Sequence, residues 1–341
     1  LLCGGTDGGN KEVIISNAKH LVAIDRPFTT IVAGNKSAND DIKAIFNEAG
    51  KDVVITENVM PQFNKLNIEP ARDAIRQLFI SRIIEAKGLN ILQAMTPYKI
   101  IPTPLAVLHA CELLSKGTKT QQGRGDLLAV DIGGATTDVY SMASGEPTVD
   151  NTMLKGLPEP WMKRTVEGDL GMRYSLTHVF EQIPGADNSE NEYMQQVKAW
   201  VELCTARPDT LAAPGSEEEK LEEFLGRSAV SMAVERHCGR IADVFTPLGL
   251  MHTQEGKDLM NVPSVIGIGG VLRNSRRPEE ILKGSLYDFM HPECTKPRKP
   301  KFYLDQKYIF ASMGLLRSIN PELAFELLDK ETVEIGCNAT V

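Results

Sequence analysis

The apolar positions of this 341-residue chain follow two alternating periods, which predicts alternating strands and helices. Short β-branched runs at Thr29–Ala33 and Val53–Thr56 predict strands. Apolar residues at helical spacing predict helices over Lys11–Ala23, around Ile42–Phe46 with Ser37 or Asn39 as its cap, and from Pro70 to Gly88. Repeated units of this kind favour a parallel sheet flanked by helices, and therefore an α/β fold.

A second part is predicted to begin after the polar, glycine-containing segment Lys116–Gly125. The continuous apolar run Leu127–Val130 predicts a strand buried on both faces, and Val262–Ile268 predicts another. Between them, Glu192–Cys204 and Ser216–His237 have the spacing of helices. We therefore divide the chain into residues 1–125 and residues 126–341, with a helical insertion at about residues 185–240 of the second part.

The segment DLLAVDIGGATTDVYSM, residues 126–142, combines residue types that bind phosphate and metal ions. Asp131 stands at the end of the apolar strand, and Asp138 follows seven residues later, so the two are candidate metal-binding carboxylates. Glycines between them permit close approach of the backbone. The pattern predicts a hairpin whose tip wraps phosphate oxygens, formed by Gly133, Gly134, Ala135, Thr136 and Thr137. A plain hairpin turn would not account for the carboxylates and hydroxyls.

A second glycine cluster, VIGIGGVLRN, follows another apolar segment and spans residues 265–274. Its glycines would let a base and a ribose lie against the backbone, with Arg273 stacking or pairing nearby; the candidate residues are Gly267, Gly269, Gly270 and Arg273. Such an elbow between a strand and a helix also occurs for packing reasons alone. Its pairing with the Asp131 motif, about 135 residues upstream, favours a nucleotide site.

These motifs resemble those of a known superfamily. DIGGATTD resembles the second phosphate motif of the actin-like ATPases, which include sugar kinases and heat-shock chaperones, and VIGIGGVLRN resembles their adenosine motif. The nearer resemblance is to the accessory proteins of glutamate (methylaspartate) mutase, carried also by GGTDGGNKEVI, RTVEGDLGMR (164–173) and PELAFELL (321–328). It implies an actin-like, ribonuclease H-like fold of two lobes that binds ATP or ADP with Mg²⁺.

The resemblance also identifies a departure. Members of the superfamily carry a first phosphate motif of the DIGST type near the N-terminus, and nothing before Asp131 matches it. The chain also begins with Leu1 rather than Met. We therefore expect the first lobe to be incomplete in this sequence, with half of the phosphate clamp absent and ATP turnover by this piece impaired.

Two further segments carry candidate chemistry. Glu167 and Asp169 lie in a glycine-containing bend some thirty residues after the hairpin, where one carboxylate would orient an attacking water; a capping acid and a surface acid are the alternative. The opening stretch LLCGGTDGGN is either a strand-to-helix elbow with Asn10 as the cap of the next helix, or a ligand loop. It lacks both the GxGxxG and the GxxxxGK[ST] pattern, which favours the elbow.

Composition narrows the function classes. A formal charge of −8 argues against nucleic acid as a partner, and the basic run KPRKPK (296–301) is predicted to be an exposed linker because of its prolines. No apolar stretch is long enough for a membrane helix. The six scattered cysteines have no metal or disulfide spacing, which predicts reduced thiols and a cytoplasmic location. The oligomeric state has no signature in the sequence.

By resemblance, the leading functional hypothesis is an ATP-dependent, chaperone-like reactivating protein. Its partners would be the subunits of an adenosylcobalamin-dependent mutase or aminomutase, which loses activity when the cobalt–carbon bond of its cofactor breaks irreversibly. A small-molecule kinase of the same fold and a scaffold that binds nucleotide without hydrolysing it remain as alternatives.

Overall fold

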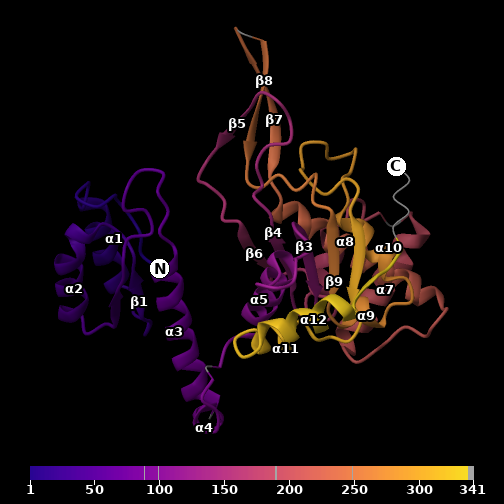
Figure 1. Cartoon of the computed structure of the whole chain (residues 1–341), viewed down its shortest axis with the longest axis horizontal. Helices are drawn as coiled ribbons and strands as arrows, with labels where there is room; N and C mark the ends of the chain where they lie inside the picture. The colour runs from indigo at the N-terminus through magenta and orange to yellow at the C-terminus, as the bar shows by residue number, and fades with distance from the viewer. Residues whose placement is uncertain (88, 99, 189, 248, 337–341) are drawn as a thin grey trace. The chain divides into compact units, whose positions relative to one another are not determined.

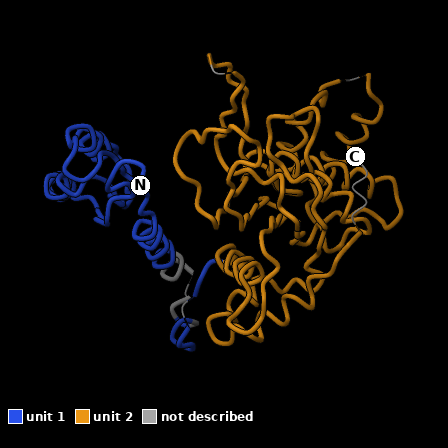
Figure 2. The backbone as a smooth tube through the Cα atoms, turned by 45° about the horizontal axis from the view of Figure 1, so that its top comes forward, with its two compact units in different colours: residues 1–102 blue, residues 103–341 orange. Residues whose placement is uncertain are grey.

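The chain folds into two compact units, Leu1–Pro102 and Thr103–Val341 (Figures 1 and 2). The computed structural model describes residues 1–87, 89–98, 100–188, 190–247 and 249–336. The sequence-based division at 125/126 differs from this one by a single helix, α5 (Thr103–Lys116). Eight of its side chains are buried, and it packs on the sheet of the second unit, so it belongs to that unit despite the polar segment that follows it.

Unit 1 is a small α/β layer. Strands β1 (Thr30–Val32) and β2 (Val53–Ile55) pair in parallel, and Leu2 extends the sheet through a parallel bridge to Val32. Helices α1 (Glu12–Val22) and α2 (Asn39–Glu48) pack on it. Their shared core consists of Leu2, Ile14, Ala18, Val32, Ala38, Ile42 and Phe46. The predicted βα alternation is therefore confirmed in this unit.

The start of α2 differs from the sequence-based expectation. Neither Ser37 nor Asn39 caps it; a short 3₁₀ helix, Lys36–Ala38, precedes it, and the Asn35 side chain accepts from the backbone N–H of Ser37 at 3.0 Å. Asn35 is fully buried, and its Oδ1 accepts the N–H of Gly8 as well as that of Ser37. The capping side chain is therefore Asn35, which lies before both predicted residues and caps the 3₁₀ helix that leads into α2.

Helices α3 (Glu69–Lys87) and α4 (Leu89–Ala94) complete unit 1. Pro70 lies in the first turn of α3 as expected. Ile75 and Phe79 of this helix are 44% and 50% exposed. The side chain of Ile83 and the predicted helix end at Gly88 lie outside the described residues.

The core of unit 2 is a six-stranded sheet in the order β11–β10–β9–β3–β4–β6. Strands β3 (Leu127–Ile132), β4 (Thr137–Met142) and β6 (Met162–Glu167) form an antiparallel meander. Strands β9 (Ser264–Ile268) and β10 (Lys301–Asp305) run parallel to β3, and β11 (Thr332–Glu334) is antiparallel at the edge. Together with unit 1, this sheet confirms the α/β class.

Helices cover both faces of this sheet, which explains why Leu127–Val130 is continuously apolar. One face packs on α5, α11 (Phe310–Leu316) and α12 (Pro321–Glu331). The other face packs on α6 (Leu176–Glu181), α7 (Glu192–Ala206), α8 (Glu217–His237) and α10 (Pro278–Leu282). Helices α7 and α8 are the two predicted in the helical insertion, and α8 packs directly against the central strands.

A second sheet projects from unit 2 at the top of Figure 1. It consists of β5 (Thr152–Lys155), β8 (Gly249–Glu255) and β7 (Arg240–Thr246), in that order. Phe245 near its tip is 85% exposed. The remaining elements are α9 (Gly270–Asn274) and the 3₁₀ helix Lys283–Ser285.

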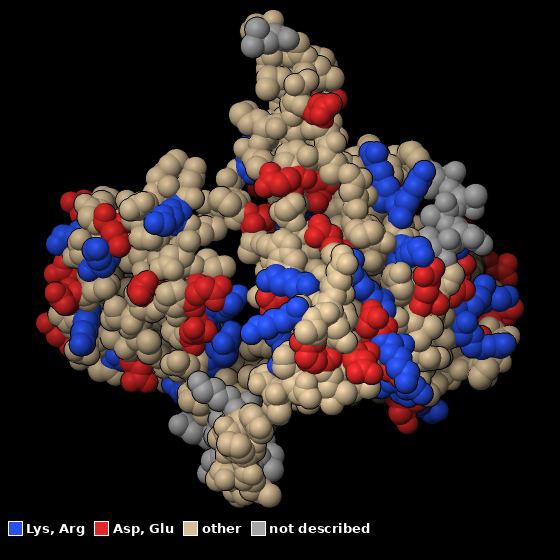
Figure 3. All heavy atoms as spheres, viewed as in Figure 1, with Lys and Arg blue, Asp and Glu red and all other residues tan. Residues whose placement is uncertain are grey.

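The basic run at residues 296–301 is exposed only in part: Arg298, Lys299 and Lys301 are exposed, whereas its first lysine and both prolines are buried. Lys296 is 1% exposed and donates to the Ser231 hydroxyl at 2.9 Å, and Pro297 and Pro300 are buried beside it. On the face in Figure 3, basic and acidic side chains are interspersed over unit 2. Four free cysteines, Cys111, Cys204, Cys238 and Cys294, are buried as small apolar residues; Cys337 lies outside the described chain. In the described part, no helix has the length and apolar character to cross a membrane.

A glycine sets the approach of α11 to α5. A Cβ on Gly314 would lie 1.8 Å from the Ala106 carbonyl oxygen, so Gly314→Ala should separate the helices and lower the free energy of unfolding by about 2 kcal/mol. Urea denaturation followed by tryptophan fluorescence measures this for unit 2 alone, because Trp161 and Trp200 are the only tryptophans of the chain. Gly168→Ala, with nothing within 4 Å, is the matched control. Equal stabilities of the two variants would contradict the proposed contact.

Candidate functional site

The predicted phosphate hairpin joins β3 to β4. Asp131 pairs with Asp138 across the two strands, and the hairpin closes with the N–H of Gly133 donating to the Thr136 carbonyl at 2.9 Å. Thr137 is fully buried, and its hydroxyl donates to the Leu170 carbonyl. The hydroxyl of Thr137 thus anchors the hairpin internally, whereas Gly134, Ala135 and Thr136 form the accessible tip.

At the hairpin tip the backbone carbonyl groups accept hydrogen bonds, whereas the backbone amide groups have no acceptor in the described part of the chain. The carbonyls of Gly133 and Gly134 accept backbone N–H groups from the segment 172–174 at 2.8–3.0 Å, and the Ser175 hydroxyl donates to the Ala135 carbonyl at 2.9 Å. The amide groups of Gly134, Ala135 and Thr136 donate to no acceptor within the described residues. Consecutive free amides on a rigid turn can bind an anion such as a phosphate.

Asp131 is a half-buried carboxylate without a hydrogen-bond partner in the part of the chain that the structure describes. Its pKa is raised to about 6, first by burial and then by the neighbouring carboxylates of Asp138 and Asp305. Asp305 stands at the end of β10 and accepts the backbone N–H groups of Ile309 and Phe310 at 2.9 and 3.1 Å. Three acids therefore meet at one end of the sheet, and Asp131 is the one left for a cation.

Asp138, the second candidate metal ligand, is already paired. Its carboxylate accepts from Arg164 Nε at 2.8 Å and from the Thr136 hydroxyl at 3.3 Å. Across residues 1–336, apart from the undescribed positions, no cluster of three or more His, Cys, Asp or Glu is arranged to hold a metal ion. This is compatible with Mg²⁺, which commonly keeps several waters and takes one or two carboxylates together with substrate phosphates.

The second glycine cluster lies directly beside Asp131. Strand β9 pairs in parallel with β3, with Ile268 opposite Asp131, and Gly269 follows with a φ of +99°. A Cβ on Gly269 would lie 2.4 Å from the Ile132 carbonyl oxygen and 2.7 Å from Asp131 Oδ1. The fold thus brings together two glycine motifs that are about 135 residues apart in sequence.

The other residues of this elbow have different surroundings. A Cβ on Gly267 would lie 2.9 Å from Leu272 Cδ1, so this glycine serves core packing. Gly270 is exposed, and the space that its Cβ would fill is open, with Asn274 Nδ2 the nearest atom at 3.8 Å. Arg273 is exposed and donates from Nε to the Gln306 carbonyl at 3.2 Å. Gly270 is therefore the position of this elbow where a flat ligand can approach the backbone, whereas Gly269 is needed for the close contact with β3.

Glu167 ends β6, Asp169 follows it, and both bind Arg236 of α8. The guanidinium contacts Glu167 Oε2 at 2.6 Å and both oxygens of Asp169 at 2.8 Å. Hydrogen bonds from Arg236 lower the pKa of Asp169 to about 2, which makes it a weak proton acceptor. In this arrangement Arg236 holds the pair and stabilises the bend, a role that differs from the capping acid and surface acid considered from the sequence.

Sequence reasoning missed three residues at this end of the sheet. Arg164 pairs with Asp138, Asp305 contributes to the acidic group, and Tyr308 adopts a left-handed φ of +56° close to Asp131 and Asp305. Burial and these two acids raise the pKa of Tyr308. A signal for Asp305 was present, because KFYLD ends an apolar strand with an acid, as LLAVD does.

The opening glycine loop belongs to unit 1 and is closed by its own contacts. Asn35 Nδ2 donates to the Gly9 carbonyl at 2.9 Å while its Oδ1 accepts the Gly8 N–H at 3.1 Å. Asn10 Oδ1 accepts the N–H of Val13 in the first turn of α1 at 3.2 Å, although the N-cap position of this helix is Lys11, one residue later than predicted. These contacts support the elbow interpretation.

Comparison with known proteins gives a family match over nearly the whole chain. The family described as MutL protein matches residues 1–332. Among curated proteins, Protein MutL of Clostridium tetanomorphum is 46% identical over 338 residues, covering 98% of this chain and 73% of that protein.

The raised pKa of Asp131 predicts a pH-dependent stability. In an unfolded chain an aspartate titrates near about 4, so ionisation between about pH 4 and 6 destabilises the folded state. Asp131→Asn should therefore raise the free energy of unfolding of unit 2 by about 2–3 kcal/mol at pH 8 and by much less at pH 4. Urea denaturation at the two pH values measures the difference, with the exposed Asp187→Asn as control. A gain of equal size at both pH values would contradict burial of the charge.

Proposed function

Because this chain belongs to the MutL protein family, we propose that it is an ATP-dependent accessory protein that reactivates an adenosylcobalamin-dependent mutase. Glutamate (methylaspartate) mutase or an aminomutase is the proposed partner. This partner follows from the resemblance of GGTDGGNKEVI, DIGGATTD and IGIGGVLRN to the accessory proteins of that mutase. The actin-like ATPase fold is part of the same proposal.

One observation carries the nucleotide part of the proposal: an unpaired carboxylate, three free amides and an open glycine elbow lie at one end of one sheet. The amides of Gly134, Ala135 and Thr136 would hold phosphate oxygens. Asp131 would hold hydrated Mg²⁺, and Gly270 would leave room for the adenosine. The bound Mg²⁺ would neutralise charge on the phosphates.

The remaining residues of the site position these groups. Arg164 neutralises Asp138, so that two adjacent carboxylates do not both require a cation. The segment 172–175 donates hydrogen bonds to the carbonyl groups of the hairpin tip. It leaves the backbone amide groups of the tip free. Such a rigid donor array needs little reorganisation when an anion binds.

The cellular role requires two states that bind the partner differently. A nucleotide that contacts both the hairpin and the elbow would favour one arrangement of the protein, and its loss would favour another. In the proposed cycle, one state opens the inactivated mutase, so that damaged cobalamin leaves and intact cofactor binds.

A nucleotide-binding scaffold without hydrolysis is the second candidate, because of one specific observation. Glu167 and Asp169, the acids considered for orienting water, are both held by Arg236. If they remain so when nucleotide is bound, neither is free to act on a water molecule. Steady-state phosphate release at saturating Mg·ATP separates the two candidates.

Asp131→Asn should weaken binding of Mg·ADP on the order of tenfold, because the amide removes the charge that holds the hydrated ion. Calorimetric titration with and without Mg²⁺ measures this, and affinity for metal-free ADP should change little. Asp187→Asn is the control for charge alone. An unchanged Mg·ADP affinity would exclude the metal role of Asp131.

Gly270→Val should weaken ADP binding to the same extent with and without Mg²⁺, because the added side chain would fill the open space beside the elbow. The same titrations measure it, and Gly168→Val, where space is also open, is the control. A loss of ADP affinity that depends on Mg²⁺ in Asp131→Asn, and one that does not in Gly270→Val, would distinguish the phosphate part of the site from the adenosine part. Normal binding by a folded Gly270→Val protein would contradict the adenosine assignment.

The partner assignment is tested with a mutase inactivated in turnover. The protein, Mg·ATP and fresh adenosylcobalamin should together restore mutase activity, and omission of ATP should abolish the recovery. Recovery without ATP, or no association with any adenosylcobalamin-dependent mutase, would contradict the proposal even if nucleotide binds.

A further inference from the structure

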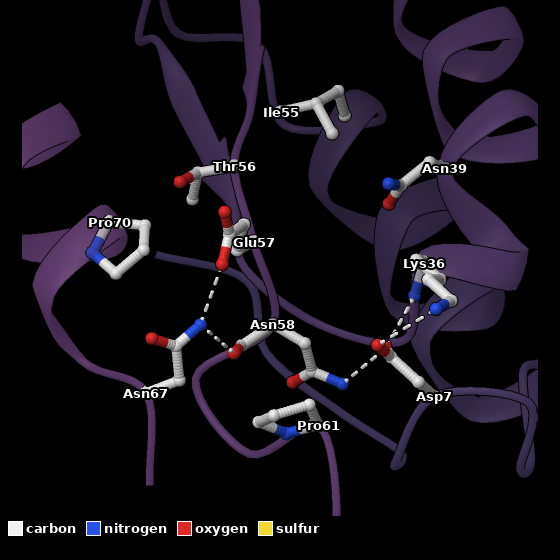
Figure 4. Close-up of a pocket in the computed structure, with 10 residues that line it drawn as sticks. All are labelled: Asp7, Lys36, Asn39, Ile55, Thr56, Glu57, Asn58, Pro61, Asn67 and Pro70. Carbon is white, nitrogen blue, oxygen red and sulfur yellow. Dashed lines mark hydrogen bonds and ion pairs between the residues drawn. The ribbon is translucent and has the colours of Figure 1, made fainter.

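Unit 1 contains a pocket of about 610 Å³ that the proposed nucleotide chemistry does not use (Figure 4). It lies at the carboxyl ends of β1 and β2, between the start of α2 and the start of α3. The carboxyl ends of parallel strands are the usual position of ligand sites in open α/β sheets. All of its lining residues come from residues 7–70, so the pocket is complete within this unit.

The pocket wall has more free acceptors than donors. Asn39 Oδ1 is buried and has no hydrogen-bond partner among the described residues. The Thr56 hydroxyl has no partner there either, and the exposed Glu57 carboxylate accepts one bond, from Asn67 at 2.9 Å. In Figure 4 the side chains of Thr56 and Glu57 lie on one side of the pocket and that of Asn39 on the other. A ligand that supplies N–H or O–H groups would therefore find its acceptors at Thr56 and Glu57, which are accessible from the pocket.

The charged residues of the pocket indicate which kind of hydrogen-bond donor it would bind. Asp7 is already neutralised, since it accepts from Asn58 Nδ2 at 3.0 Å and the Lys36 N–H at 3.1 Å, with Lys36 Nζ at 3.6 Å. These contacts lower the pKa of Asp7, which stays ionised. Glu57 has no ion-pair partner among the described residues. A net negative wall disfavours phosphates and carboxylates and favours a cation.

We propose that this pocket binds a small aliphatic ligand that carries a primary ammonium group. An ammonium has three N–H donors and no acceptor, and the Thr56 hydroxyl and the Glu57 carboxylate, which lie on the same side of the pocket, would accept two of them. The apolar part of the wall, formed by Ile55, Pro61 and Pro70, suits a short alkyl chain.

The proposal also gives the opening glycine loop a role. Asn58 donates to the Gly5 carbonyl and to Asp7, both at 3.0 Å, and so fixes the loop against one wall of the pocket. The loop then shapes a ligand site without binding phosphate itself. This inference is independent of the proposed nucleotide site in unit 2.

The test uses n-butylammonium as the probe, with 1-butanol and D-ribose at the same concentration and ionic strength. Saturation-transfer NMR on the intact protein should detect saturable binding of the amine and none of the two neutral compounds. Glu57→Gln keeps an acceptor for Asn67 but removes the charge, and should weaken amine binding about tenfold. Thr56→Val should weaken it as well, because it removes the neighbouring acceptor, whereas Glu48→Gln, at the far end of α2, should not.

Each contrary result overturns the proposal. Absence of saturable amine binding, or equal binding by Glu57→Gln, would exclude an ammonium site. Binding of ribose in preference to the amine would assign the pocket to a polyol. Binding of 1-butanol as tightly as n-butylammonium would show that the pocket recognises only the alkyl chain. Far-ultraviolet circular dichroism confirms that the variants are folded, because unit 1 contains no tryptophan.

Discussion

The candidate site depends on the close contact between the β9–α9 elbow and the end of β3. Gly269 places its backbone against the Ile132 carbonyl and the Asp131 carboxylate, at distances that leave no space for a side chain. Its positive φ turns the chain into α9, so the contact and the turn both require glycine. Because β9 is parallel to β3, this single approach brings the elbow and the hairpin to the same edge of the sheet.

The electrostatics of that edge follow from the same geometry. Asp131 near the end of β3, Asp138 near the start of β4 and Asp305 at the end of β10 lie at the same edge of the sheet. The structure compensates two of them differently: Asp138 by Arg164, and Asp305 by backbone N–H groups. Asp131 has neither compensation, and its pKa is raised accordingly. A partly buried acid without a compensating partner destabilises the folded protein when it is ionised. Such acids are typical of functional sites. The three free amides of the hairpin tip, a few residues away, supply the complementary positive potential.

The sequence predicted the strands, the hairpin and the two glycine motifs because each is encoded in a short segment. An apolar run that ends in an acid and two glycines can be recognised locally, as at Asp131. The roles of Glu167 and Asp169 could not be predicted in this way, because their partner Arg236 comes from a helix almost seventy residues later. Likewise, burial of Lys296 depends on Ser231, and α5 joins unit 2 through packing that the polar segment after it conceals. In each of these cases the role of the residue or helix depends on a partner that is distant in the sequence.

The pairing of β3 with both β4 and β9 has a consequence for the order of folding. The β3–β4 hairpin joins residues close in sequence and needs little loop closure, whereas β9 is separated from β3 by more than a hundred residues that include α7 and α8. During synthesis the hairpin is therefore complete well before β9 has left the ribosome. Until then Asp131 lies at a sheet edge without the burial that is the largest cause of its raised pKa. Most of the unusual proton affinity of this carboxylate is thus acquired late in chain assembly, when β9 with its elbow, and then Asp305 at the end of β10, arrive.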